Sequence, residues 1–328
     1  MADLTTNYMG LELKNPLIAS SSGFTDSLEK LKTLEEKGIG AVVLKSLFEE
    51  EIIHEMEETF HKMKSENFLY PETYNYFEYE DIEDTLVNYI KLIKDAKKEL
   101  SIPIIPSVNC ISHQKWTYFA KEMEDAGADA LELNAFILPS DFTHTSEENE
   151  KMYFDIIKEV QKQVSIPVSL KLSYYFSALA PTLQELSRTG IKSLVLFNRF
   201  YSPDFNLKTM KVVPSHVLSQ PGDIAISLRW IAIMSGRVDC DLSASTGVHD
   251  GQGLIKQLLA GADTVQIAST IYKNGYDIIP DMLKVLDNWM DENEFDNIKE
   301  FQGKMSQKEL KNPAAYERVQ FMKYFSEK

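Results

Sequence analysis

The sequence predicts an α/β protein with a (β/α)8 barrel, formed by a single domain over residues 1–328. Four segments share one form: a glycine, followed two or three residues later by an apolar strand that ends in a polar residue. Two more apolar strands begin with Ser-Ile-Pro, and another two complete a set of eight. Helical patterns lie between consecutive strands, and this alternation predicts a parallel sheet covered by helices. Eight such units in a chain of this length predict a closed barrel.

The predicted elements follow one another in a regular order. Residues 4–13 predict a small hairpin that closes one end of the barrel. The glycine before a strand ends the preceding helix in a left-handed turn, and proline is tolerated at the first residue of a strand. The eight strands are expected at 15–23, 38–46, 101–109, 127–134, 165–173, 190–198, 237–247 and 261–269.

Two insertions interrupt this order, at about 47–80 and 199–222. Both leave the carboxyl ends of strands, where a barrel builds its site and where long loops usually carry function. Asp26 with Glu29, and Thr182 with Glu185, have the spacing of capping boxes and predict helix starts. An open doubly wound sheet is the alternative fold, but the first strand is not followed by the Gly-rich turn of such sheets.

The composition argues against several classes of protein. Acidic residues outnumber basic ones by 50 to 34, and a net charge of -16 repels the phosphate backbone of nucleic acids. No apolar run approaches about 18 residues and no leader pattern opens the chain, so we expect neither a membrane span nor secretion. Cys110 and Cys240 form no disulfide framework, which favours a cytoplasmic location.

The acidic stretch 49–66 raises the question of a metal site, because it contains Glu50, His54 and His61. Apolar residues recur in the same stretch at helical spacing. We therefore expect an amphipathic surface helix there and no bound metal.

Polar residues close the predicted strands and would meet at one end of a barrel. A lysine that closes an apolar strand is costly unless its ammonium finds an anion or acceptors. Lys45 and Lys171 both face this end, which favours an electron-rich ligand. The full ring consists of Ala19, Ser20, Ser21, Lys45, Ser46, Ser107, Asn109, Asn134, Lys171, Asn198, Ser245, Thr246, Gly247, Ala268 and Ser269.

Small residues end the seventh and eighth strands, where barrels commonly bind phosphate through backbone N–H groups. A phosphate site beside lysines, serines and amides suits FMN, since a cation stabilises the anionic reduced flavin. Pyridoxal phosphate and a sugar phosphate would also use a lysine and a phosphate turn, so these residues alone leave all three ligands open.

The chain resembles the class 1 dihydroorotate dehydrogenases and the flavin domain of dihydropyrimidine dehydrogenase. The similar segments occur in the same order from residue 15 to about 305: NPLIASSSG, VVLKS, IIPSVNCISHQKWTYFAKEMEDAGADALELN, VSLKLS, LFN, SASTGVHDGQGLIKQLLAGADTVQIAS and FQGKMS. The resemblance implies an FMN-binding barrel and a cytoplasmic homodimer.

The resemblance also implies roles for single residues. Lys45 and Ser46 match the pair beside the flavin ring, and Lys171 matches the lysine at its electron-rich edge. Asn134 matches the amide shared between flavin and substrate, and the substrate contacts are expected from Lys45, Asn134 and Asn198. The remaining cofactor contacts are expected from Ala19, Ser20, Ser21, Asn109, Asn198, Ser245, Thr246, Gly247, Ala268 and Ser269, although the family more often has Gly-Gly and Gly-Thr in the two phosphate turns.

The substrate loop departs from the family pattern. Relatives carry Ser-Cys-Pro-Asn, with a proton-abstracting cysteine, where this chain has Phe136, Ile137, Leu138 and Pro139. Neither Phe nor Ile accepts a proton, so the expected base is absent. In a second loop, the family's Pro-Asn becomes Pro71-Glu72, and a carboxylate there would disfavour an anionic orotate-like ligand.

The general base is therefore unassigned. Cys110, His144 and Tyr174 are weak candidates. Each also has an ordinary structural explanation: a packed thiol, a solvated loop and a packed rim side chain, respectively.

The sequence supports an FMN-dependent oxidoreductase that transfers hydride between flavin N5 and a CH–CH bond of a small pyrimidine-like or related substrate. A true dihydroorotate dehydrogenase with an unusual base is the nearest alternative. A lyase or isomerase with Lys45 or Lys171 as Schiff-base nucleophile, and a flavin-binding protein without catalysis, are the others. The chain has no cysteine cluster for an iron–sulfur centre, so a separate electron-transfer subunit fits the sequence.

Overall fold

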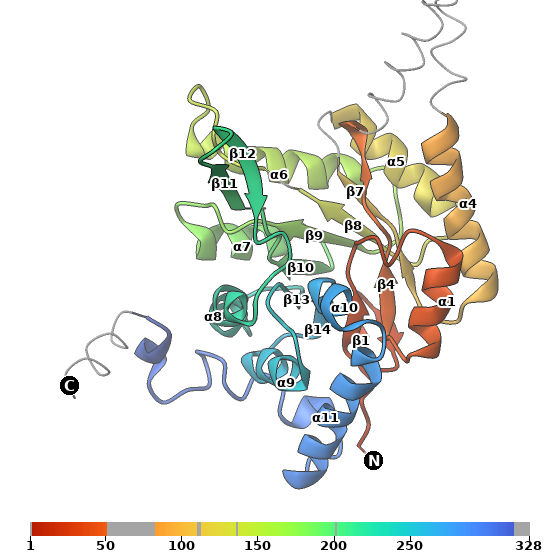
Figure 1. The fold of residues 1–328 in the computed structure, drawn as a ribbon. Coiled ribbons are helices and arrows are strands. Elements are labelled where there is room, and N and C mark those ends of the chain that lie inside the picture. Colours follow the sequence, from red (N-terminus) through yellow and green to blue (C-terminus); the bar gives the residue numbers. More distant parts are fainter. Residues whose placement is uncertain (1, 51–82, 110–112, 136, 201, 318–328) are drawn as a thin grey trace, which may run out of the picture.

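The computed structural model describes residues 2–50, 83–109, 113–135, 137–200 and 202–317. A parallel sheet forms its centre, and helices surround the sheet (Figure 1). The sheet strands, in chain order, are β3 (Leu17–Ala19), β4 (Ala41–Val43), β5 (Leu47–Phe48), β6 (Ile104–Ile105), β7 (Ser107–Asn109), β8 (Leu131–Asn134), β9 (Val168–Leu172), β10 (Ser193–Leu196), β13 (Asp241–Ser245) and β14 (Thr264–Ile267).

The sheet closes on itself into a barrel. β3 pairs with both β4 and β14, and the pairing continues from β7 through β8, β9, β10 and β13 to β14. β4 pairs with β6 and β5 pairs with β7, and only Pro106 separates β6 from β7. β4 and β5 therefore act as one barrel strand, and β6 and β7 act as its neighbour. All eight predicted strands are confirmed at their predicted positions, and the fold prediction is correct.

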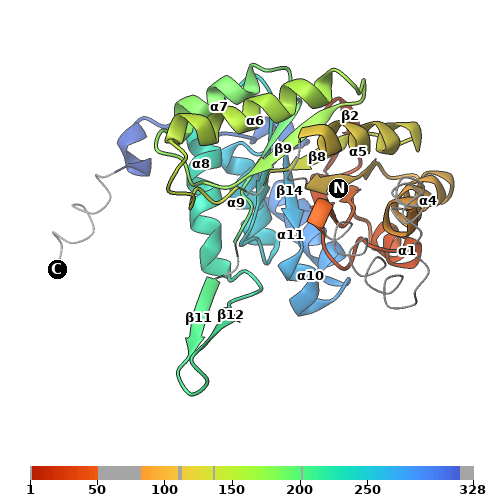
Figure 2. The same ribbon diagram turned by 90° about the horizontal axis from the view of Figure 1, so that it is seen from above.

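Helices form the outer layer of the barrel (Figure 2). They are α1 (Leu28–Glu36), α4 (Glu83–Glu99), α5 (His113–Asp125), α6 (Ser146–Gln161), α7 (Leu179–Ser187), α8 (Ile224–Met234), α9 (Gly251–Ala260), α10 (Ser269–Asn274) and α11 (Ile278–Glu292), with short 3-10 turns at Pro221–Asp223, Ile298–Glu300 and Pro313–Tyr316. In the described part of the chain, no helix is both long enough and apolar enough to cross a membrane.

Two apolar cores lie on opposite faces of the sheet. The larger core packs the helices against the outer face of the barrel. The smaller one fills part of the interior and joins Ile18, Ala41, Val43, Ile105 and Ala130 from the first four barrel strands to the predicted hairpin. On the other four strands the corresponding buried positions are small and polar: Ser169, Ser193, Ser243 and Thr264. One half of the barrel interior can therefore accommodate polar and charged side chains.

The N-terminal hairpin consists of β1 (Thr6–Tyr8) and β2 (Leu11–Leu13), as predicted. Its turn residues Met9 and Gly10 both have positive φ, which gives the tight turn that suits a two-residue hairpin. Tyr8 and Leu13 are buried and join the inner core, and Asp241 accepts a hydrogen bond of 2.6 Å from the Met9 amide. The hairpin thus covers the amino end of the barrel.

The second insertion contains an antiparallel hairpin of β11 (Ser202–Asn206) and β12 (Lys211–Ser215), which projects away from the barrel (Figure 2). The first insertion contains β5, but its residues 51–80, which include His54 and His61 of the predicted helix, fall outside the described residues.

The two predicted capping boxes are wrong. Helix α1 begins after Ser27, and Asp26 instead pairs with Lys30 at 2.8 Å. Thr182 lies inside α7, where its hydroxyl donates to the Ala178 carbonyl one turn earlier. Both errors arise because the i, i+3 spacing of a capping box also occurs inside helices, where lysines and carbonyls compete for the same polar groups.

Candidate functional site

A cleft of about 500 Å³ opens at the carboxyl ends of the barrel strands. Barrel enzymes build their sites at this end. Nine of the predicted ligand-binding residues line the cleft: Ser20, Ser21, Lys171, Asn198, Ser245, Thr246, Gly247, Ala268 and Ser269. A second hollow of about 540 Å³ lies at the opposite end, beside Asn7 and Lys192, and contains none of the predicted residues. The first cleft is therefore the candidate site.

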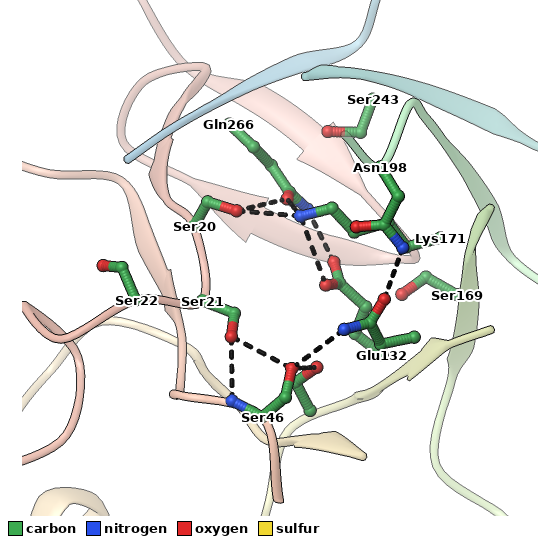
Figure 3. Close-up of polar contacts among 12 residues, drawn as sticks. Ser20, Ser21, Ser22, Ser46, Glu132, Ser169, Lys171, Asn198, Ser243 and Gln266 are labelled. Carbon is green, nitrogen blue, oxygen red and sulfur yellow. Dashed lines mark hydrogen bonds and ion pairs between the residues drawn. The ribbon is translucent and has the colours of Figure 1, made fainter. Parts of the chain in front are cut away.

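Lys171 forms the floor of this cleft. Its side chain is almost fully buried, and its ammonium donates to Ser20 Oγ at 2.9 Å and to Gln266 Oε1 at 3.0 Å (Figure 3). Ser20 also donates to Gln266 Oε1 at 3.0 Å. These acceptors hold a fixed positive charge beneath any molecule in the cleft.

A buried carboxylate below Lys171 was not predicted. Glu132 lies on β8 with 1% of its surface exposed, and its Oε1 is 3.7 Å from Lys171 Nζ. Its Oε2 accepts from Gln266 Nε2 at 2.7 Å. Strand alternation could have revealed it, because Glu132 lies two residues before Asn134 and therefore faces the barrel interior as well.

A second polar network joins the ends of several strands on the other side of the cleft (Figure 3). Ser46 accepts from Asn134 Nδ2 at 3.1 Å and lies 3.0 Å from the Ser21 hydroxyl. Ser107 extends the network, 2.8 Å from Ser46, and Asn198 donates to Asn134 Oδ1. Asn134 and Ser46 thus belong to the site through this network, although neither lines the cleft itself.

The small residues at the ends of β13 and β14 form the opposite end of the cleft. Gly247 has φ +81°, and a Cβ placed there would lie 2.0 Å from the amide nitrogen of Ile224, at the start of α8. Thr246 has φ +77°, a conformation that favours glycine, and its hydroxyl donates to the Phe197 carbonyl. Ser269 accepts from the Ser219 amide at 3.0 Å. Phosphate sites commonly combine small residues with a helix N-terminus, whose backbone N–H groups point at the anion.

The other predicted contacts lie near the cleft without lining it. Ala19 is buried within β3, and Asn109 ends β7. Lys45 is exposed at the carboxyl end of β4, and its amide donates to the Thr25 carbonyl. The predicted ring is therefore assembled at one end of the barrel, with Lys171 in its floor and Lys45 on its rim.

Neither of the described base candidates, Tyr174 and His144, is among the residues that line the cleft. Burial, followed by the neighbouring Tyr175, raises the pKa of Tyr174, so its phenol fits a proton donor better than an acceptor. His144 is 48% exposed on a loop and lies 3.4 Å from Asp141. Cys110 falls outside the described residues.

The described residues that directly follow Asn134 are apolar. Ala135 is buried, Ile137 packs against the outer core and Leu138 is half exposed. None of these side chains accepts a proton. Phe136 falls outside the described residues.

Arg199 is a further cleft residue to which the sequence assigned no role. It donates to the carbonyls of His216 and Val217 and lies 3.4 Å from Asp223. These contacts hold the segment after β12 against the rim of the cleft. Within the described ranges, no group of three or more His, Cys, Asp or Glu side chains could hold a metal.

Comparisons with known proteins agree with this architecture. Residues 3–290 match the family model described as dihydroorotate dehydrogenase. The chain is 28% identical to the dihydroorotate dehydrogenase B (NAD(+)) catalytic subunit of Thermoplasma volcanium, over 92% of this chain and 98% of that protein. It is 24% identical to the NAD-dependent dihydropyrimidine dehydrogenase subunit PreA of Escherichia coli, over 92% of this chain and 76% of that protein. The chain belongs to the dihydroorotate dehydrogenase family.

Proposed function

We propose that the protein is an FMN-dependent oxidoreductase that acts on a CH–CH bond of a small pyrimidine-like or related substrate. The observation that carries this proposal is the buried ammonium of Lys171, held at the floor of a cleft whose far end is built from small residues. The matched family and the names of its relatives, which are dehydrogenases, support the same class of reaction.

The residues of the cleft fit FMN. Its volume of about 500 Å³ lies in the range of small-molecule sites, roughly 300–1,000 Å³. Thr246, Gly247, Ala268 and Ser269 would hold the phosphate, and Lys171 with Ser20 would meet the polar edge of the ring. When bound, FMN supplies the hydride acceptor or donor. Lys171 stabilises negative charge at that edge, and the buried floor excludes water from it.

The substrate side supports a reaction that differs from ordinary dihydroorotate oxidation. Asn134 and Asn198 supply amides to a polar ring, as in the family. Ala135, Ile137 and Leu138, which directly follow Asn134, supply no proton acceptor, and Tyr174 is suited to donate a proton. We infer that the favoured direction is reduction of a substrate double bond, with proton donation from Tyr174 or solvent.

Genuine dihydroorotate oxidation is the second candidate, because several relatives bear that name. Relatives of both kinds are named as subunits, which supports a separate electron-transfer partner for this chain. We further infer one domain over residues 1–328, a homodimer and a cytoplasmic location.

The cofactor is tested first. Purified protein should carry about one FMN per chain, seen as a yellow flavin spectrum and as FMN released on denaturation. Lys171→Met should weaken FMN binding about tenfold or more, because it removes the buried cation. A wild-type protein that stays colourless after incubation with FMN contradicts the proposal, and borohydride trapping of a substrate on Lys45 or Lys171 would point to the Schiff-base alternative.

The substrate is tested with the flavin-loaded protein. Uracil- and orotate-like compounds, and other small enones, are screened as oxidants of the chemically reduced protein under anaerobic conditions. Faster reoxidation by a neutral ring than by orotate supports the proposed substrate class. Steady orotate production from dihydroorotate with an artificial acceptor would favour the second candidate.

A further inference from the structure

Glu132 lies directly beneath the cleft, where no bound molecule can touch it. Ser20, Lys171 and Gln266 line the cleft, whereas Glu132 does not. Its Oε2 is bonded to Gln266, and its buried Oε1 has no hydrogen-bond partner and faces Lys171 at 3.7 Å. This carboxylate can therefore influence a ligand through its charge and through its effect on Lys171 and Gln266, but not by direct contact.

Gln266 is hydrogen-bonded to both charged groups (Figure 3). Its amide oxygen accepts from Lys171, and its amide nitrogen donates to Glu132. A direct hydrogen bond between an ammonium and a carboxylate is about 2.8 Å long, so a separation of 3.7 Å keeps the two groups apart. The ammonium is bonded instead to Ser20 and Gln266, on the cleft side of the pair.

The barrel interior screens the charge of Glu132 poorly. Burial, followed by this negative charge, raises the pKa of Tyr8, which reaches the interior from the N-terminal hairpin. A buried ammonium also needs a counter-charge, because desolvation of an unpaired ion is costly. Glu132 meets this need for Lys171 while it leaves the ammonium available to the cleft.

We propose that Glu132 is a counter-charge that limits how much positive charge Lys171 presents to the cofactor, and that Gln266 is the spacer that keeps the ammonium at the cleft. Both are positioning residues, and this inference rests on the proposed flavin function. It predicts opposite effects on the midpoint potential of the flavin: loss of the Glu132 charge should raise it, and loss of the Gln266 spacer should lower it.

Glu132→Gln tests the counter-charge. The new amide keeps the size of the side chain and an oxygen that can accept from Gln266, but it removes the negative charge. The reduced, anionic flavin should then be favoured about tenfold or more, which raises the midpoint potential by about 30 mV. Ser169→Ala is the matched control, because Ser169 is buried on the same strand as Lys171 and its hydroxyl donates to the Leu131 carbonyl; it should leave the potential unchanged.

Gln266→Met tests the spacer. Without the amide, the ammonium should move onto the free Oε1 of Glu132 and away from the cleft. The midpoint potential should fall by a similar amount, and FMN should bind more weakly. A general loosening of the site would lower FMN affinity in both variants, but it would not produce opposite shifts in potential.

The flavin-free protein gives an independent measurement by urea unfolding. Glu132→Gln should lower the unfolding midpoint, and the double variant Glu132→Gln/Lys171→Met should recover most of the loss, because no ammonium is left without a counter-charge. A Glu132→Gln potential that is unchanged or lower overturns the inference, as does a double variant no more stable than the single one. If Glu132→Gln does not fold, the inference is tested by Gln266→Met alone: a lower midpoint potential supports it, and an unchanged or higher one contradicts it.

Two different measurements distinguish a failure of the proposed flavin function from a failure of this inference. Wild-type protein that binds no FMN contradicts the flavin function, while the unfolding comparison still shows whether Glu132 and Lys171 form a coupled pair.

Discussion

Gly247 is the residue on which the small-residue end of the cleft most depends. A methyl group at this position would lie 2.0 Å from the Ile224 nitrogen and 2.6 Å from the Asp223 carbonyl carbon, both of them backbone atoms. Gly247→Ala should therefore displace the start of α8, lower the free energy of unfolding by about 3 kcal/mol or more, and abolish FMN binding. Urea unfolding and flavin fluorescence measure the two effects.

Gly10→Ala is the matched control for this prediction. Gly10 has φ +82°, nearly the same as Gly247, but a methyl group there would have no neighbour within 4 Å. Its cost should be the backbone strain alone, about 1 kcal/mol, with normal FMN binding. Equal losses of stability in the two variants would show that packing against α8 is not what requires Gly247.

At the level of single residues, the strand ends and the inward direction of Glu132 could be read from the sequence, but the contacts beneath the strand ends could not. Asn134, Lys171 and Asn198 stand out because each is polar and ends an apolar strand. Glu132 and Gln266 sit inside strands, and their contact with Lys171 joins β8, β9 and β14 across the closed barrel. Only the barrel geometry brings those strands face to face, so no local pattern reveals the contact.

Three of the surrounding helices are attached to the sheet in the same way, by a side-chain acceptor near the helix end that bonds the start of a strand. We call this attachment a fastening. Helices α1, α5 and α7 are each followed by a glycine, and each has a hydrogen-bond acceptor three residues before that glycine. The acceptor bonds the start of a later barrel strand: not the next strand after the helix, but the one after that. The acceptors are Glu35, bonded to Ser101 and Ile102; Glu124, bonded to Ser165 and Ile166; and Ser187, bonded to Asp239. This fastening explains why both Ser-Ile-Pro strands begin with serine, whose hydroxyl and amide bond the same carboxylate.

Glu124 provides the test of this fastening. Its side chain is 13% exposed and accepts hydrogen bonds of 2.7, 2.6 and 3.2 Å from Ser165 and Ile166. Glu124→Ala should lower the free energy of unfolding by about 2 kcal/mol, because it leaves the strand start without its charged acceptor. Glu122→Ala on the same helix is the control and should change stability by less than about 0.5 kcal/mol. A similar loss in both variants would contradict the fastening.

The same carboxylate predicts a dependence on pH. Burial acts to raise the pKa of Glu124, but the hydrogen bonds from Ser165, Lys121 and Ile166 outweigh it and hold the pKa at about 2. A depressed pKa in the folded state gives stability that is present above the ordinary value of 4.5 and is lost as the pH falls towards 2. The stability difference between wild type and Glu124→Gln should therefore shrink as the pH falls from 5 to 3.

At the level of elements, the strands were predictable and the helix starts were not. A buried strand of a parallel sheet is apolar throughout, and the glycine before it is fixed by a left-handed turn, so both leave strong local signals. Helix α6 has a true capping box at Thr145 and Glu148, whereas the two predicted boxes do not form. Several polar side chains near each helix start compete for the same backbone groups, so a local spacing does not show which side chain caps the helix.

Over the whole molecule, two partly buried aspartates attach the N-terminal hairpin and a segment after α11 to the amino end of the barrel. Asp241 accepts from Met9 of the N-terminal hairpin. Asp263 accepts from the Leu242 amide at 2.7 Å and from Gln302 Nε2 at 2.8 Å. Gln302 belongs to the FQGKMS segment, whose backbone also bonds to the end of α9. This segment, which the sequence identified only by resemblance, therefore fastens the C-terminal part of the chain to the barrel.

These aspartates make the stability of the whole fold depend on pH in the direction opposite to Glu124. Burial raises the pKa of Asp263 to about 6, against the hydrogen bonds that lower it. A raised pKa in the folded state contributes stability that is full below the ordinary value of 3.8 and is lost as the pH rises through 6. The corresponding loss is at most about 3 kcal/mol.

Asp263→Asn isolates this contribution, because the amide cannot ionise and keeps an oxygen acceptor. Urea unfolding between pH 4 and pH 7 should show the wild type losing up to about 3 kcal/mol relative to the variant. Asp281→Asn, an exposed position on α11, is the control and should follow the wild type at every pH. Parallel curves for the wild type and Asp263→Asn would mean that Asp263 stays ionised throughout. The hydrogen bonds from Leu242 and Gln302 to Asp263 would then depend on its charge, and Asp263→Asn should weaken them at every pH.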